Sequence, residues 1–108
     1  MIVEYDYWTG HISEVESSLK RSVAAYLRHG HKVKIGITNN PEQRAIKHSN
    51  KINWLKLVVK YKTSSINYMN NMERILIDHH WYEIENEIAG GGGPNGKNGP
   101  YYLYVLLR

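Results

Sequence analysis

An arginine and a histidine lie four residues apart directly after a short apolar segment, and they are the first sign of chemistry in this chain. Apolar residues occupy every second position of the segment, which favours a half-buried strand over residues 33–38. An asparagine N-cap, a proline at the first helical position and a glutamine three residues past the cap then predict a helix over residues 41–49. Arg44 and His48 share one face of that helix. A strand, a turn and a helix that carry these two groups are typical of a site that handles phosphodiesters.

A glutamate lies in the middle of an otherwise mostly apolar helical stripe. At about 100° per residue, Glu73 shares one face of a helix predicted over residues 65–82 with a row of neighbours. These are Ile66, Met69, Leu76, Ile77 and His80. An uncompensated buried carboxylate is costly, so Glu73 needs an arginine, a metal ion or a proton. Its hard oxygens suit Mg²⁺ or Mn²⁺; a structural ion pair with Arg44, or a position at the solvent edge of a cleft, is the alternative.

The remaining patterns predict the elements that position these groups. Residues 2–8 alternate in polarity like a strand, and Ser13 opens a capping box at the start of a helix over residues 13–29. Residues 54–61 and the β-rich run at 101–107 predict two further strands. All 108 residues are therefore expected to form one α/β domain, a small antiparallel or mixed sheet of three to four strands flanked by three helices.

Four motifs, taken in order, resemble those of the GIY-YIG nuclease family. The triplet 34–36, Lys-Ile-Gly, stands where the family has Tyr-Ile-Gly, and Arg44 follows its glycine by eight residues, as the family's essential arginine does. Glu73 matches the metal-binding glutamate, and Asn86, near a glycine-rich run, matches a later asparagine. The resemblance covers roughly residues 33–107 and implies a metal-dependent endonuclease that hydrolyses phosphodiester bonds in DNA. It further implies Mg²⁺ or Mn²⁺ on Glu73, with Arg44 contacting the phosphate and the transition state.

The match to the family is incomplete at its tyrosines. Lys34 replaces the tyrosine of the second signature triplet, and no Gly-Ile-Tyr triplet occurs about ten residues earlier. We therefore expect the N-terminal strand to be the first signature strand, with the helix that follows it as an insertion. On this interpretation Tyr5 or Tyr7 activates the water, with Tyr26 as the alternative. His48 assists, and Lys34 contacts the scissile phosphate or stabilises a tyrosinate.

Basic residues concentrate in the middle of the chain. The stretch 20–62 holds eleven Lys or Arg and one acid, whereas the formal net charge of the whole chain is +4. This distribution predicts one positive side and a polyanionic partner, most simply DNA. The expected nucleic-acid contacts are Lys32, Lys47, Lys51 and Asn86. A homodimer or a separate partner would supply sequence specificity, because so small a domain has little surface for reading bases.

Two other classes of function stay open. A nuclease-like binding module that has lost cleavage would explain the missing signature tyrosines. A protein-interaction or inhibitory domain becomes the better explanation if the basic residues are divided between faces of the fold.

Composition excludes several kinds of site. The chain has no cysteine, so disulfides and thiolate metal sites are excluded. Its first residues are acidic where a secretory signal would be basic, and no apolar run approaches the length of a membrane span. We therefore expect a cytoplasmic protein without a membrane partner. The glycine-rich run has the spacing of a Walker A loop, but Asn98 replaces the Ser or Thr that this motif needs.

Overall fold

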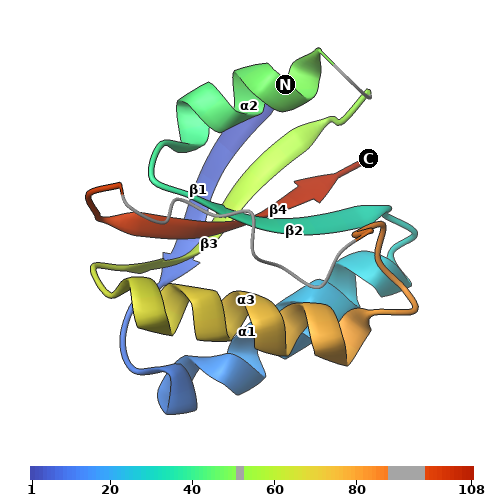
Figure 1. The fold of residues 1–108 in the computed structure, drawn as a ribbon. Helices are drawn as coiled ribbons and strands as arrows, with labels where there is room; N and C mark the ends of the chain where they lie inside the picture. The colour runs from blue at the N-terminus through green and yellow to red at the C-terminus, as the bar shows by residue number, and fades with distance from the viewer. Residues whose placement is uncertain (51–52, 88–96) are drawn as a thin grey trace.

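The chain folds as a four-stranded mixed sheet with helices on both faces (Figure 1). The computed structural model describes residues 1–50, 53–87 and 97–108. Along the chain its elements are β1 (Ile2–Trp8), α1 (Ile12–Arg28), β2 (Val33–Thr38), α2 (Pro41–Ser49), β3 (Lys56–Thr63), α3 (Ile66–His80) and β4 (Tyr101–Leu107). The strands lie in the order β1-β3-β4-β2, with β1 parallel to β3 and the other two pairings antiparallel. The predicted α/β fold, a small sheet flanked by three helices, is confirmed.

The sheet separates two apolar cores, because its strands send alternate side chains to opposite faces. α1 and α3 cover one face (Figure 1), and the core beneath them includes the fully buried Leu19, Tyr61, Met69, Leu76 and Leu103. α2 covers part of the other face, over a smaller cluster of Ala45, Trp54, Leu57, Val59, Tyr104 and Leu106. Within the described residues, no helix has both the length and the apolar character needed to cross a bilayer.

Local capping signals set where the helices begin. The strand and the helix predicted around the first motif are confirmed to the residue as β2 and α2, and Asn40 Oδ1 accepts the backbone N–H of Gln43 at 3.1 Å. The predicted capping box of Ser13 is wrong. α1 begins one residue earlier than expected, and His11 Nδ1 accepts the Ser13 N–H at 3.1 Å. An imidazole nitrogen thus takes the capping role expected of a serine hydroxyl.

The order of the strands in the sheet does not follow their order in the sequence. β1 and β2 form opposite edges of the sheet, and β2 pairs with β4, whose Tyr104 lies opposite Gly36. The N-terminal strand, interpreted as the first signature strand, is therefore separated from β2 by β3 and β4. Composition explains the order, because β4 is apolar on both faces, as a central strand is, whereas Glu4 and Asp6 favour an edge position for β1.

Candidate active site

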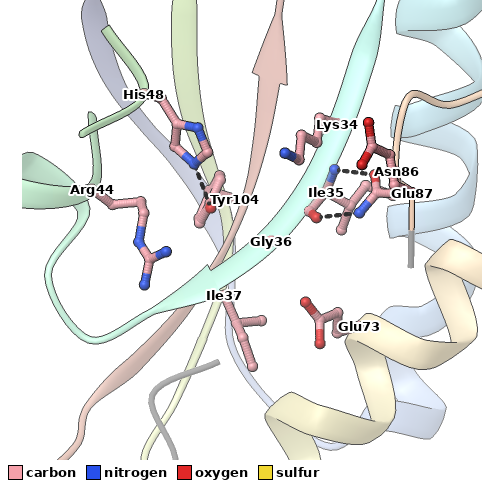
Figure 2. A pocket seen from close by; sticks show the side chains of 10 residues that line it. All are labelled: Lys34, Ile35, Gly36, Ile37, Arg44, His48, Glu73, Asn86, Glu87 and Tyr104. Carbon is pink, nitrogen blue, oxygen red and sulfur yellow. Dashed lines mark hydrogen bonds between the residues drawn. The ribbon is translucent and has the colours of Figure 1, made fainter. Parts of the chain in front are cut away.

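A cavity of about 300 Å³ opens at the β2 edge of the sheet, between α2 on one face and α3 on the other (Figure 2). Most of the residues predicted to be catalytic line it, namely Lys34, Arg44, His48 and Glu73. Its wall is completed by Ile35, Gly36, Ile37, Asn86, Glu87 and Tyr104. Groups that are distant in sequence therefore line one cavity.

Glu73 reaches the cavity from the buried face of α3. The residue is only 6% exposed, and its helix neighbours Met69, Met72, Leu76 and Ile77 are fully buried. Its carboxylate lies beside β2 and points toward the cavity (Figure 2). The prediction of a buried carboxylate on an apolar stripe is confirmed, and at this depth its negative charge favours a cation in the cavity.

α2 brings Arg44 and His48 to the other side of the β2 edge. Both side chains are half-buried and lie one turn apart, so the predicted shared face is confirmed. Figure 2 shows the Arg44 guanidinium on one side of β2 and the Glu73 carboxylate on the other. His48 Nε2 lies 3.1 Å from the hydroxyl oxygen of Tyr104, and the two rings meet edge to face with centroids 5.9 Å apart. This contact fixes the imidazole at the cavity wall.

Gly36 makes room for a tyrosine from the neighbouring strand. Tyr104 is 4% exposed, and its ring lies across β2 at the glycine with which it pairs in register. A Cβ at position 36 would overlap both the hydroxyl and the ring of Tyr104. The lack of a side chain at this position therefore lets a phenol from a central strand reach a cavity at the edge of the sheet.

The hydroxyl of Tyr104 shares one electrostatic environment with the charged groups of the cavity. Burial raises the pKa of Tyr104 from 10.0 to about 12, the positive charge of Arg44 opposes this rise, and the negative charge of Glu73 adds to it. The hydroxyl is therefore protonated at neutral pH. Any further positive charge in the cavity would lower this pKa, in the same direction as Arg44.

Asn86 binds the exposed edge of β2 as a further strand would. Its Oδ1 accepts the backbone N–H of Ile35 at 2.9 Å, and its Nδ2 donates to the Ile35 carbonyl at 2.8 Å. The backbone N–H of the preceding Glu85 donates to the Val33 carbonyl at 2.8 Å. Asn86 was predicted to contact nucleic acid, but its amide is engaged with the strand, so its place in the structure is that of a positioning residue.

The tyrosines predicted to activate water lie elsewhere. Tyr5 and Tyr7 belong to β1, and β3 and β4 separate that strand from β2 and the cavity. The Tyr5 hydroxyl donates to Glu42 at 3.0 Å, and Tyr26, the alternative, lies on α1 and does not line the cavity. The prediction is wrong because the order of strands in the sheet does not follow their order in the sequence. The tyrosine of the site is Tyr104, whose signal in the sequence is the Tyr-Leu-Tyr alternation of the C-terminal β-rich run.

The basic residues do not gather on one side. Those of α1 and those of α2 lie on opposite faces of the sheet, because these helices cover different faces. Within the described ranges, three lysines of this stretch form ion pairs, Lys20 with Glu16, Lys56 with Glu4 and Lys60 with Asp6. The prediction of a single positive side is therefore wrong. Of the expected nucleic-acid contacts, Lys32 and Lys47 are exposed, and Lys51 falls outside the described residues.

The cavity offers carboxylate donors without a cluster of protein ligands. In the part of the chain that the structure describes, no group of three or more His, Asp or Glu side chains is arranged to hold a metal ion. Glu73 supplies a buried carboxylate, and the exposed Glu87 lines the same cavity. Mg²⁺ keeps several waters and binds proteins through one or two carboxylates together with substrate phosphates. These residues fit such a hydrated ion and do not form a complete protein cage.

Comparisons with known proteins assign no family to this chain. No model of a protein family, no curated protein and no solved structure matches it. The resemblance to the GIY-YIG nucleases therefore rests on the motif residues alone and stays a prediction.

Proposed function

We propose that this protein is a metal-dependent endonuclease that hydrolyses phosphodiester bonds in DNA. The observation that carries the proposal is the convergence of Glu73 and Arg44 on one cavity from opposite faces of the sheet. Lys34, His48 and Tyr104 line the same cavity, so a phosphate bound there would meet two cationic side chains and a pair of groups able to move a proton.

The charged residues have roles that follow from their chemistry. The planar fork of Arg44 suits two non-bridging phosphate oxygens and stabilises the negative charge that grows on them during attack. Lys34 adds a point charge on the other side of Gly36 (Figure 2). Glu73 would hold Mg²⁺ or Mn²⁺, which supplies Lewis-acid stabilisation of the phosphate and of the leaving 3′ oxygen.

His48 and Tyr104 would handle the proton of the attacking water. The water oxygen forms the new bond to phosphorus, the bond to the 3′ oxygen breaks, and a nearby base must accept the released proton. Because the pKa of Tyr104 is raised to about 12, its hydroxyl is protonated at neutral pH. His48 Nε2, 3.1 Å from that hydroxyl, would then accept the proton, with Tyr104 relaying it.

A plasmid-nicking assay tests the proposal. The wild-type protein with Mg²⁺ or Mn²⁺ is expected to nick supercoiled plasmid, and Arg44→Ala and Glu73→Ala are each expected to abolish nicking. Glu73→Gln keeps the shape of the side chain and removes its charge, so it guards against loss of folding. Glu83→Gln alters an exposed carboxylate outside the cavity and is the matched control. Folded wild-type protein that does not nick contradicts the proposal.

Two observations favour other functions. Lys34 in place of a signature tyrosine favours a binding module without cleavage, which would show salt-sensitive DNA binding that Glu73→Ala leaves unchanged. The division of the basic residues between both faces of the sheet favours a protein-interaction or inhibitory domain. That function predicts no affinity for DNA in the same experiment.

A further inference from the structure

An aromatic and basic row crosses the face of the sheet that α2 covers only in part. Tyr102 of β4 pairs in register with Lys62 of β3, and the Lys62 ammonium lies near the ring of Tyr7 on β1. We call Tyr7, Lys62 and Tyr102 the Tyr-Lys-Tyr row. Tyr7 is 42% exposed, and the other two members are half-buried. Three strands that lie side by side (Figure 1) thus present one accessible surface.

Lys62 contacts aromatic rings, as Lys60 does, but within the described part of the chain it differs from Lys56 and Lys60 in having no ion pair with an acid. Its Nζ lies 5.9 Å from the ring centroid of Tyr7 and 5.7 Å from that of Tyr102. The two other lysines of β3 form ion pairs with acids of β1, whereas none of the ion pairs among the described residues involves Lys62. The charge of Lys62 is therefore available to an anion from solution.

The row adjoins the cavity along β4. Tyr102 and Tyr104 are two residues apart on one strand, so their side chains project from the same face at a spacing of about 7 Å. Their register partners on β2, Thr38 and Gly36, place them on the face where α2 presents Arg44. A chain of nucleotides with one phosphate at Arg44 would continue over the row.

We propose that the Tyr-Lys-Tyr row binds unpaired nucleotides next to the bond that is cut, so that the substrate is single-stranded or locally unpaired DNA. This inference rests on the proposed function, because the cavity supplies the site of cleavage. Bases stack on the exposed ring of Tyr7 and on the accessible part of the half-buried Tyr102 ring, and Lys62 binds the phosphate between them. In a duplex the faces of the bases are covered by one another, so only unpaired bases gain from these rings.

Fluorescence anisotropy in EDTA measures binding without cleavage. The probes are a labelled single strand of about 12 nucleotides, within the span of small single-strand-binding folds, and a blunt duplex of the same sequence. Tyr7→Ala is expected to weaken single-strand binding about 5- to 150-fold, as loss of one base stack does, and to leave duplex binding unchanged. Tyr7→Trp keeps a stacking ring and is expected to retain the affinity. Tyr82→Ala, which alters a 98% exposed tyrosine just after α3, is the control.

The outcomes separate the row from the nuclease. If Tyr7→Ala weakens the binding of both probes equally, or of neither, the Tyr-Lys-Tyr row does not bind unpaired nucleotides. Nicking of plasmid by the wild-type protein would still support the proposed hydrolysis. Loss confined to the single strand supports the row even if the plasmid is not nicked. Should Tyr7→Ala fail to fold, Tyr7→Thr keeps a β-favouring residue on this edge strand and gives the same comparison.

Discussion

Replacing Gly36 with alanine tests the geometry on which the candidate site depends. The ring of Tyr104 lies across β2 at this residue, and an added Cβ would overlap the hydroxyl and the ring carbon that bears it. Tyr104 is 4% exposed and has His48 against it, so the ring has little room to move away. Overpacking of this kind costs about 1–3 kcal/mol of unfolding free energy. We expect Gly36→Ala to lose that amount in urea denaturation and to lose nicking, because the displaced hydroxyl no longer meets the imidazole.

A second substitution isolates the cause of that loss. In a Tyr104→Ala background the overlap is absent, and alanine is preferred to glycine in a strand by about 0.5–1 kcal/mol. Gly36→Ala should then stabilise the protein by up to that amount, although Tyr104→Ala itself costs about 3–5 kcal/mol. The double-mutant cycle gives a coupling free energy of about 1.5–4 kcal/mol between positions 36 and 104. If Gly36→Ala lowers the unfolding free energy equally in the wild-type and the Tyr104→Ala protein, the ring does not fit over the glycine as described.

Other measurements test single contacts of the site and the core. Asn86→Ala leaves both backbone groups of Ile35 without their side-chain partner, so urea denaturation should show a loss of about 1–3 kcal/mol, and an unchanged midpoint would contradict the positioning role. Because the pKa of Tyr104 is raised from 10.0 to about 12, its contribution to stability is complete below pH 10 and is lost as the pH rises through about 12. Tyr104→Phe should therefore flatten the fall in melting temperature over that alkaline range; an equally steep fall in the variant would count against this. Burial lowers the pKa of His80 from 6.5, so its contribution to stability is complete above that pH and is lost as the pH falls through the lowered value. The melting temperature of His80→Met should therefore fall less on acidification than that of the wild type. Equal falls in the two proteins would show that His80 does not cause the acid sensitivity.

Local signals were sufficient to predict the elements around Arg44. The asparagine cap, the proline and the glutamine that begin α2 act within four residues of one another, so their effect does not depend on the rest of the fold. The position of Glu73 was predictable for a similar reason. A helix repeats every 3.6 residues, and an apolar stripe shows which face is buried before any partner is known.

The pairing of strands is a property of distant residues and could not be predicted in this way. Tyr5 and Tyr7 alternate in β1 just as Tyr102 and Tyr104 do in β4, so alternation alone cannot show which strand stands beside Gly36. The choice depends on burial over the whole sheet, where β4 fits the centre and β1 the edge. The prediction of a single positive side was wrong for a similar reason, because the sequence does not show which face of the sheet each helix covers.

The position of β4, which follows the other three strands in the sequence but lies between β3 and β2 in the sheet, affects how the protein folds during synthesis. Within the described residues, β2 pairs with no strand except β4, so a nascent polypeptide that has left the ribosome only as far as residue 100 holds β2 without a partner. Tyr104 and its part of the cavity wall emerge together with β4. During co-translational folding β1 can therefore pair with β3 first, whereas β2 joins the sheet, and the cavity closes, only once β4 has emerged.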